Sequence, residues 1–494
     1  MIGHGYATLA AMTEVRHAAA ARPAAEPAMA ADEVVRLTAG TLLKRSARAI
    51  RGGAVDSRAV QPGEVFVALP GERTDGHRFL GEAAAAGAAA LVVTTPPAAD
   101  VLEAFGDVTV IQVRDGLRAL QAIAAGWRSR FSPLVVGITG SIAKTSTKEA
   151  IAAVLSTRRV TLKNEGNLNN EIGLPLTLLR LGPEHEAAVL EMGMYVGGEI
   201  ADLARLARPS IGVVTAVEGV HLSRIGSLDA IEDAKAELVE ALPRDGVAVL
   251  NADDERVVGM AARTAARPLT YGFAEDADVR ADEVRSAGFD GMRFVLQATV
   301  AGRAVRQPVA IPGLGRLSIH NALAGAAVGL ATGIDPAAVA AGLAAGWSAP
   351  HRATIRRVGD IRIVDDSYNA SPGSVAAALD LLAGLPGRRV AVLGEMLELG
   401  SASDEAHAAV GSAAAATVDL LVVIGAGAAG IAEGASTAGL DSARILRVDD
   451  RDAALDALRS RLRPGDVVLV KASRGVALDV LVDDLAAELG ERPS

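Results

Sequence analysis

One stretch decides the fold: Pro133-Leu-Val-Val-Gly-Ile-Thr-Gly-Ser-Ile-Ala-Lys-Thr145. Residues 133–139 form an apolar run bounded by turn residues, which is typical of a buried parallel strand. A loop from Gly137 to Thr145 follows, and a helix continues from Ser146. Backbone N–H groups in such a loop, together with the helix N-terminus, attract an anion. The stretch therefore predicts a phosphate-binding loop in an α/β domain.

Two residues of this loop carry the expected nucleotide chemistry. Lys144 would contact the outer phosphates and the Thr145 hydroxyl would hold Mg²⁺. The usual spacing has glycine where this chain has Ile138 and Ala143, so the match is incomplete. Ala143 is harmless at negative φ, but the left-handed region would cost it roughly 1–2 kcal/mol. An ordinary strand–turn–helix connection with a surface lysine is the alternative. The nucleotide-binding residues expected in the loop are Gly137, Thr139, Gly140, Ser141, Ile142, Ala143, Lys144, Thr145 and Ser146.

The composition predicts a globular protein of several domains. A chain of 494 residues exceeds one compact core, and roughly two to four domains are expected. Half the residues are hydrophobic and 22% are charged, as in ordinary globular proteins. The net charge of −10 argues against nucleic acid as the main partner, because no basic surplus neutralises phosphates. The absence of cysteine excludes disulfides, thiolate metal sites and cysteine nucleophiles.

We expect the N-terminal segment to carry no targeting signal. No apolar run in the chain reaches the length of a membrane span, so no membrane insertion is expected. The first 33 residues are Ala-rich with scattered charges and lack the apolar stretch of a signal peptide. We expect residues 1–33 to be a disordered extension, with Met29 as an alternative start, and a cytoplasmic location.

Alternating strand and helix patterns divide the rest of the chain into three α/β domains, 34–115, 116–348 and 349–494. The first is small, with strands at 64–69 and 90–94 and a helix at 79–86. The second is a doubly wound sheet of the P-loop ATPase type, with hairpins expected over 271–312 and a helix over 321–333. The third is Rossmann-like. Strands are expected at 133–139, 187–191, 211–215, 247–251, 361–364, 389–393, 420–424 and 466–470, and helices at 116–131 and 375–385.

Further short motifs follow one another along the chain. Each is weak alone, but together they resemble, in order and with plausible gaps, the Mur ligase family of peptidoglycan synthesis. The resemblance runs from about Val34 to the C-terminus. The motifs are Asp56-Ser-Arg58 with Pro62-Gly63, the phosphate loop, Asn167-Leu-Asn-Asn-Glu-Ile-Gly-Leu-Pro175, Glu191-Met-Gly-Met194, His221, Ala234-Lys235-Ala-Glu237, Asn321-Ala-Leu-Ala324, Asp365-Asp-Ser-Tyr-Asn-Ala370, Leu393-Gly-Glu-Met-Leu-Glu-Leu-Gly400 and Val470-Lys-Ala-Ser-Arg474.

The resemblance implies an ATP-dependent ligase that joins D-alanyl-D-alanine to UDP-N-acetylmuramoyl-tripeptide. An amide is made from a carboxylate by converting one oxygen into a leaving group, and ATP does this by forming an acyl phosphate that an amine attacks. Such phosphoryl transfer depends on positioning and charge neutralisation. The three domains would bind the UDP substrate (34–115), ATP (116–348) and the amino acceptor (349–494). We expect a monomer.

The same resemblance assigns roles to individual residues. Lys144, Glu191, His221 and Lys235 would be catalytic, and Mg²⁺ (two ions) would be held by Thr145, Glu191, His221 and Lys235, the last as a CO₂-derived carbamate. A helix-capping glutamate, a structural histidine and an ion-paired surface lysine are the alternatives. ATP would also contact Asn321, Arg352 and Asp366. The substrate-binding residues would be Asp56, Ser57, Arg58, Asn167, Asn169, Asn170, Tyr368, Asn369, Lys471, Ser473 and Arg474, although Asp, Asn and Ser are also common turn formers.

Some residues depart from the family pattern. Leu317 and Ser318 stand where His and Asn are usual, Ala216 replaces a frequent Asn, and His351 replaces a Gly before Arg352. Together with Ala143 these residues flank nucleotide or metal positions. Three other functions stay open: the family member that adds the third amino acid of the peptide, a folylpolyglutamate synthetase, and a nucleotide-binding paralogue without catalysis. The Tyr368-Asn-Ala370 and 394–400 motifs favour the D-alanyl-D-alanine reaction.

Overall fold

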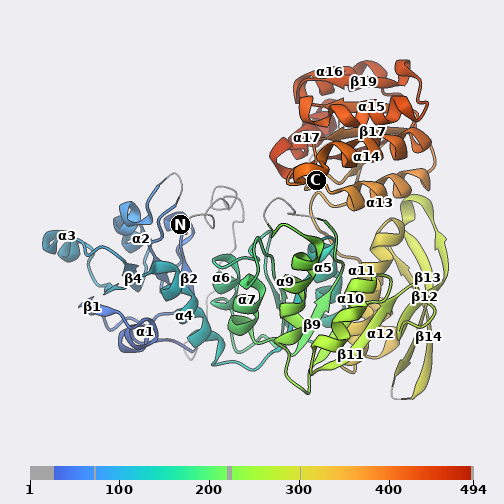
Figure 1. The fold of residues 1–494 in the computed structure, drawn as a ribbon. Helices are drawn as coiled ribbons and strands as arrows, with labels where there is room; N and C mark the ends of the chain where they lie inside the picture. The colour runs from blue at the N-terminus through green and yellow to red at the C-terminus, as the bar shows by residue number, and fades with distance from the viewer. Residues whose placement is uncertain (1–26, 72–73, 220–224, 301, 491–494) are drawn as a thin grey trace. The chain divides into compact units, whose positions relative to one another are not determined.

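A computed structural model describes residues 27–71, 74–219, 225–300 and 302–490 (Figure 1). The chain divides into two compact units. The first comprises Met1–Gly137, Arg159–Met194 and Gly198–Ser210, and the second comprises Ile138–Arg158, Tyr195–Gly197 and Ile211–Ser494. His221 and residues 1–26 of the expected extension lie outside the described residues. Over the described ranges, the helices are too short or too polar to traverse a bilayer.

The first unit contains a five-stranded sheet with the order β1-β5-β4-β3-β2. Its strands are parallel except β1, which pairs antiparallel with β5. The predicted strands at 64–69 and 90–94 are confirmed as β3 and β4, and the predicted helix at 79–86 as α2. The elements are α1 (Ala31–Thr38), β1 (Thr41–Lys44), β2 (Gly53–Ala54), β3 (Val65–Val67), α2 (Leu80–Ala85), β4 (Ala90–Val93), α3 (Ala99–Ala104) and β5 (Thr109–Gln112).

The folded chain begins before residue 34, where the sequence placed the end of a disordered extension. The backbone N–H of Met29 donates to the Ile50 carbonyl and accepts a bond in return, at 2.8 and 2.9 Å. The Met29 side chain is 1% exposed, and α1 starts at Ala31. Alanine-rich composition suggested disorder, but burial of Met29 and Val34 fixes this segment.

Among the remaining elements of the first unit, α4 contacts α6 and α7. The Trp127 indole donates to the Leu181 carbonyl at 2.9 Å, and the buried Arg128 guanidinium donates to the Ala207 carbonyl at 2.9 Å. Strands β7 and β8 pair in parallel, and the N–H of Leu134, at the start of β6, donates to the Glu186 carbonyl. The elements are α4 (Gly116–Arg128), β6 (Leu134–Thr139, which continues into the second unit), β7 (Thr161–Lys163), α6 (Gly173–Leu178), β8 (Ala187–Glu191) and α7 (Glu199–Ala207).

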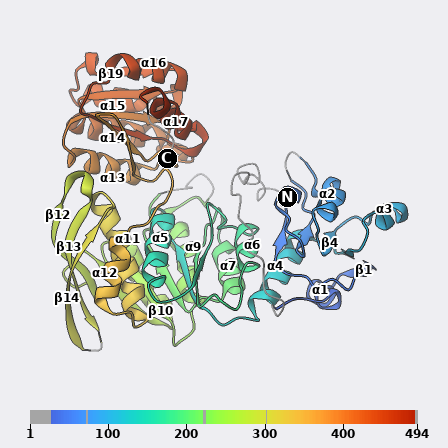
Figure 2. The same cartoon turned by 180° about the vertical axis from the view of Figure 1, so that it is seen from behind.

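In the second unit, β9 to β12 run parallel, and β12, β13 and β14 form antiparallel hairpins (Figure 2). The expected hairpins over 271–312 are therefore confirmed. The helix expected from Asn321 begins earlier, at Gly315, because the Leu314–Ser318 turn already packs inward. The elements are α5 (Lys144–Leu155), β9 (Ile211–Val214), α9 (Leu228–Glu240), β10 (Val247–Asn251), α10 (Glu255–Gly259), β11 (Arg267–Gly272), β12 (Val279–Ser286), β13 (Met292–Val300), β14 (Arg303–Ile311), α11 (Gly315–Ala331) and α12 (Pro336–Ala344).

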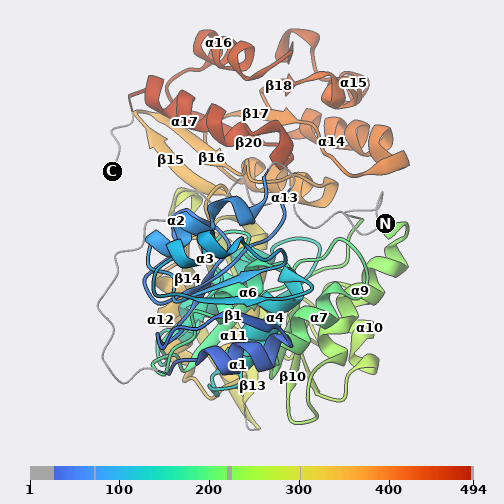
Figure 3. The same ribbon diagram turned by 90° about the vertical axis from the view of Figure 1, so that its left-hand side faces the viewer.

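A third sheet has the order β15-β16-β20-β17-β18-β19, with only the edge strand β15 antiparallel (Figure 3). Alternate residues of β17 enter different apolar clusters: Val390 and Val392 pack with α16 and α17, whereas Ala391 and Leu393 pack with α13, α14 and α15. Because successive side chains of a strand point to opposite faces, both faces are covered, as the α/β prediction required. The elements are β15 (Thr354–Val358), β16 (Ile361–Asp365), α13 (Pro372–Ala383), β17 (Arg388–Gly394), α14 (Ser403–Thr417), β18 (Leu420–Ile424), α15 (Ala429–Thr437), β19 (Ile445–Val448), α16 (Arg451–Arg461), β20 (Asp466–Lys471) and α17 (Leu478–Glu488).

Candidate active site

The phosphate loop is fastened to the segment that follows β9. The Thr215 N–H donates to the Thr139 carbonyl at 3.0 Å, and the Thr215 hydroxyl donates to the Ile142 carbonyl at 2.6 Å. The Ser141 N–H donates to the Ala216 carbonyl at 2.8 Å. The Ser141 hydroxyl also donates to the Glu218 carbonyl at 2.9 Å and accepts from the Glu218 N–H at 2.8 Å. These bonds hold the phosphate loop against residues 215–218.

Two residues of the loop adopt positive φ. Gly140 has φ +147°, and a Cβ there would lie 1.9 Å from the Thr215 hydroxyl oxygen, so only glycine fits. Ala143 has φ +63° and ψ 0° and directly precedes α5. Of the two conformations considered for Ala143, the structure has the left-handed one, which costs a non-glycine residue about 1–2 kcal/mol. The loop therefore keeps a strained backbone at the position where glycine is usual.

Lys144 folds back over the loop. Its ammonium donates to the carbonyls of Gly140 at 2.7 Å and Ser141 at 3.3 Å. Thr145 follows in the first turn of α5 and is buried. The Thr139 hydroxyl oxygen is buried at the end of β6, and in the described part of the chain no group bonds to it. These bonds hold the Lys144 ammonium at the phosphate loop.

Asn321 is joined to the phosphate-loop helix. Its side-chain carbonyl accepts a hydrogen bond from the Thr147 hydroxyl at 2.9 Å, and both side chains are buried. This bond holds the Asn321 side chain against α5. Thr147 belongs to no recognised motif, so nothing in the sequence singled it out.

Lys235 lies on α9 and is 2% exposed. Burial lowers the pKa of this lysine well below its ordinary value, and the positive charge of Lys144 lowers the pKa further. The sequence alternative of an ion-paired lysine on a solvated helix face is therefore wrong, because this side chain faces inward. Burial therefore favours the neutral amine of Lys235 over its ammonium form.

Glu191 ends β8 in the first unit and is 2% exposed. Its carboxylate accepts a hydrogen bond from the Asn169 amide at 2.7 Å. Asn164, which sequence reasoning missed, accepts from the Glu191 N–H at 2.9 Å and donates to its carbonyl at 3.2 Å. The asparagine loop is thus connected to the predicted metal ligand. Asn170 instead accepts from the N–H groups of Ile172 and Gly173 at the start of α6, which is a structural task.

Glu218 is a second residue that sequence reasoning missed. Its carboxylate lies against the start of α13, where a Cβ on Gly373 would be 2.4 Å from the Glu218 Oε2 atom. Burial raises the pKa of Glu218, and the negative charge of Asp254 raises it further. Its backbone bonds to Ser141, so this glutamate connects the phosphate loop to α13. A single Glu in a turn offers no signal of this role.

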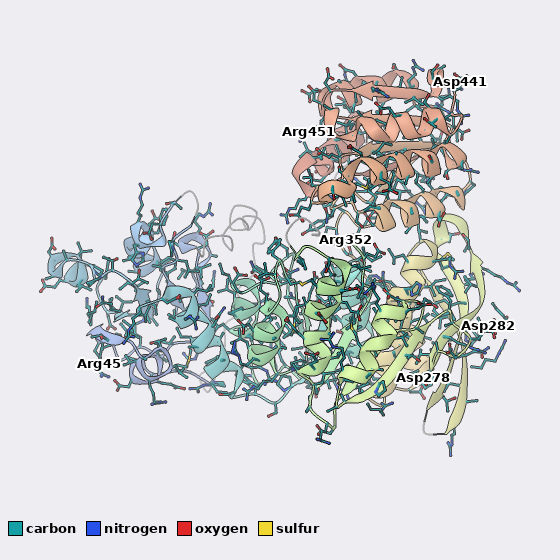
Figure 4. The ribbon with its side chains drawn as sticks, viewed as in Figure 1. Arg45, Asp278, Asp282, Arg352, Asp441 and Arg451 are labelled. Carbon is teal, nitrogen blue, oxygen red and sulfur yellow. The ribbon has the colours of Figure 1, made fainter. Side chains whose placement is uncertain are left out.

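The linker before β15 is held by the two aspartates at the end of β16. The Asp365 carboxylate contacts the His351 imidazole at 2.8 Å, and the Asp366 carboxylate accepts from the Ala353 N–H at 3.1 Å. His351 and Ala353 both have left-handed backbones, with φ +58° and +53°. Between them, the Arg352 guanidinium (Figure 4) stacks on the Tyr368 ring at 4.1 Å.

Lys471, at the end of β20, bonds to residues of the neighbouring 366–369 segment. It is 3% exposed, and its ammonium donates to the Asp366 carboxylate at 2.6 Å and to the Asn369 carbonyl at 2.9 Å. The buried Ser473 hydroxyl accepts from the Leu397 N–H and donates to the Ala370 carbonyl. These two predicted substrate-binding residues therefore organise the loops, whereas Arg474 and Asn369 are exposed.

The Asp56-Ser57-Arg58 motif forms a compact turn in the first unit. The Asp56 carboxylate accepts three bonds from Arg58, at 3.0, 2.9 and 2.7 Å. The hydrogen bonds from Arg58 hold the pKa of Asp56 below its usual value. Ser57 donates to the Glu82 carboxylate at 3.0 Å. Asp56 thereby orients Arg58, whose guanidinium keeps further N–H donors for an anion.

The structure brings most of the predicted nucleotide residues into one unit. The phosphate loop from Ile138, Lys235, Asn321, Arg352, Asp366 and the 368–369 and 471–474 residues belong to the second unit, whereas Gly137, Glu191, the asparagine loop and residues 56–58 belong to the first. Among the described residues, no three His, Cys, Asp or Glu side chains cluster as a ready metal site. His221 lies outside the described residues.

Three sequence models match consecutive parts of the chain. They are the Mur ligase family catalytic domain at residues 49–128, the Mur ligase middle domain at 138–329, and the Mur ligase glutamate ligase domain at 351–474. The UDP-N-acetylmuramoyl-tripeptide–D-alanyl-D-alanine ligase of Mycobacterium tuberculosis strain H37Rv is 40% identical over 474 residues, covering 88% of this chain and 91% of the relative.

Two solved structures extend this similarity to the fold. A crystal structure of MurF from Acinetobacter baumannii has a TM-score of 0.83 at 28% identity, covering 94% of this chain and 99% of that one. A crystal structure of MurF ligase from Thermotoga maritima in complex with ADP has a TM-score of 0.78 at 30% identity, covering 90% and 99%.

Proposed function

This chain belongs to the Mur ligase family, and we propose that it joins D-alanyl-D-alanine to UDP-N-acetylmuramoyl-tripeptide at the expense of ATP. The observation that carries this proposal is the similarity along nearly the whole chain to ligases of that name. The fastened phosphate loop, with Lys144 poised on it, supports ATP as the energy source. The complete set of domain matches favours this reaction over a binding module.

The reaction divides into two steps. The terminal carboxylate of the tripeptide attacks the γ-phosphorus of ATP, forming an acyl phosphate and releasing ADP. The dipeptide amine then attacks the acyl carbon, loses a proton and expels inorganic phosphate as the amide forms. Loop N–H groups and Lys144 would neutralise the transferring charge, while Asn321, Arg352 and Asp366 would position the nucleotide. Asp56, Ser57 and Arg58 would hold the UDP group.

Mg²⁺ fits the donors that the chain offers. The Thr145 hydroxyl and the Glu191 carboxylate would be hard oxygen ligands of the kind that this ion prefers, and the Thr139 hydroxyl, to which none of the described residues bonds, is a further oxygen at the end of β6. We assign His221 and Lys235 to the same group. Bound there, Mg²⁺ supplies charge neutralisation of the phosphates.

Lys235 would act as a carbamate. Only a neutral amine attacks CO₂, and burial favours the neutral form of Lys235 by lowering its pKa. The product is an anion that offers two oxygen ligands where an ammonium offered none. In ¹³CO₂-equilibrated buffer the wild-type protein should show a carbamate ¹³C signal that is absent from Lys235→Ala. A wild-type spectrum without this signal would contradict the assignment.

We propose that each of the three predicted domains binds a different substrate. Residues 34–115 would bind the UDP substrate, 116–348 ATP, and 349–494 the amino acceptor. Because ATP is consumed, we place the reaction in the cytoplasm, and we propose a monomer, which sedimentation would test.

Phosphate release by the purified protein tests the function. Release should require ATP, UDP-N-acetylmuramoyl-tripeptide and D-alanyl-D-alanine together. Replacing the tripeptide by the dipeptide precursor and the acceptor by a single amino acid tests for the ligase that adds the third residue. A binding module should release no phosphate with any combination. Lys144→Met should abolish release while leaving the protein folded.

A further inference from the structure

Tyr368 lies between two arginines that come from separate segments. The Arg352 guanidinium carbon is 4.1 Å from the ring centroid, and the Arg474 guanidinium carbon is 5.2 Å from it. Arg474 also donates a hydrogen bond to the Tyr368 hydroxyl at 3.0 Å. Arg352 belongs to the linker before β15, whereas Arg474 follows β20. One side chain thus orients two cations, one through its face and the other mainly through its hydroxyl.

Neither guanidinium is neutralised. Within the ranges that the structure describes, Arg352 and Arg474 form no ion pair with a carboxylate. The two contact distances place their charges within about 10 Å of each other, which is comparable to the Debye length at 0.1 M salt. They therefore repel, and the attraction of each guanidinium to the ring only partly offsets this repulsion. Two neighbouring cations that repel each other favour the binding of an anionic ligand.

The position of Arg474 indicates which anion. It lies beyond the carboxyl end of β20, the edge where parallel α/β sheets bind their ligands. Lys471, the other cation at this strand end, is buried, and its charge is already paired with that of Asp366. The acceptor dipeptide carries one carboxylate, and a guanidinium can bind a carboxylate through two parallel hydrogen bonds.

From this geometry, and resting on the proposed function, we infer that Tyr368 is a positioning residue for both substrates. Its hydroxyl aims Arg474 at the carboxylate of D-alanyl-D-alanine, and its ring face holds Arg352 for the nucleotide. The hydroxyl and the ring then have separable effects. A purely structural tyrosine would affect both substrates alike.

Steady-state kinetics of Tyr368→Phe and Tyr368→Leu separate these effects. Tyr368→Phe removes only the hydroxyl and should raise KM for D-alanyl-D-alanine about three- to tenfold, with KM for ATP within twofold of the wild type. Tyr368→Leu also removes the ring and should raise KM for ATP about two- to fivefold. Arg474→Gln should raise KM for the dipeptide roughly 10- to 100-fold. Arg447→Gln, an equal charge change on β19, is the matched control and should change neither KM.

A double-mutant cycle tests whether Tyr368 acts through Arg474. Adding Tyr368→Phe to Arg474→Gln should raise KM for the dipeptide no further. Additive effects, or a KM for ATP that follows the loss of the hydroxyl, would overturn the inference. A wild-type protein that releases no phosphate with the full substrate set refutes the proposed function itself, whereas an active wild type without the KM separation refutes only the role of Tyr368.

Discussion

Replacing Ala143 by glycine should stabilise the protein without weakening its affinity for ATP. Ala143 has φ +63°, a region that costs an alanine about 1–2 kcal/mol and a glycine almost nothing. Glycine also gains about 0.4–1 kcal/mol of entropy in the unfolded chain, which opposes the benefit. The net stabilisation is therefore up to about 1.6 kcal/mol, or a rise in Tm of up to roughly 6 °C for the domain that carries the loop.

Thermal unfolding and ATP kinetics of matched variants check this reasoning. Ala39→Gly relieves a similar strain, at φ +51°, away from the loop and should stabilise its own domain by a comparable amount. Ala153→Gly lies inside α5 and should destabilise by about 1 kcal/mol. KM for ATP should stay within twofold in Ala143→Gly, because hydrogen bonds from Thr215 and Ser141 already fix the loop. A lower Tm for Ala143→Gly would refute the argument from strain, and a large rise in KM would show that alanine itself stiffens the loop.

Three further substitutions probe the surroundings of the loop. Gly140→Ala introduces a Cβ 1.9 Å from the Thr215 hydroxyl oxygen and should lower kcat/KM for ATP by roughly 100-fold. The control is Gly333→Ala, which also has a positive φ but lies in open space, and it should leave kcat/KM for ATP unchanged. Lys235→Met replaces a buried amine by an apolar chain of similar size, so it should abolish phosphate release. It should also stabilise the protein by about 1–3 kcal/mol in unfolding experiments, because burying an amine costs free energy that burying a thioether does not. A destabilised variant would contradict this reasoning. Glu218→Gln removes a carboxyl whose pKa is raised in the folded state above its unfolded value of 4.5. Because the wild type loses stability as pH rises through this raised pKa, the Tm of the variant relative to the wild type should increase from pH 4 to pH 8. A Tm difference that does not depend on pH would contradict this prediction.

Local sequence signals located the elements well where an apolar run had clear ends. Strands β8, β10 and β18 coincide with their predicted ranges because Val, Leu and Ile runs stop at polar or glycine residues. Short strands such as β2 and β7 have two or three residues and too little pattern to be recognised. The start of α11 was missed because its first turn contains Gly315 and Ser318, which are weak helix formers that tertiary packing overrides.

For the site, the order of motifs identified residues but not their partners. Lys471 was expected to contact substrate, yet its ammonium is buried against Asp366, and only a folded structure brings residues 105 positions apart together. The hypothesis that Lys235 lies on the surface came from the charged residues near it in the sequence of α9. The helix places those residues on a different face from Lys235, which is buried. Residue type reports what chemistry a side chain can perform, while burial and pairing decide whether it is available.

The strained backbone residues are concentrated where function is predicted. Among the described residues, eight non-glycine positions have positive φ. Ala143 precedes the phosphate-loop helix, His351 and Ala353 flank Arg352, Glu398 lies in the 394–400 motif, and Ala477 follows the Arg474 loop. Such conformations cost about 1–3 kcal/mol each and persist only where surrounding contacts over-determine them. The Thr215 hydroxyl donates to the Ile142 carbonyl beside Ala143, the Asp366 carboxylate accepts from the Ala353 N–H, and Asp365 contacts His351. These contacts hold the loops that would meet ATP and the acceptor in a defined shape.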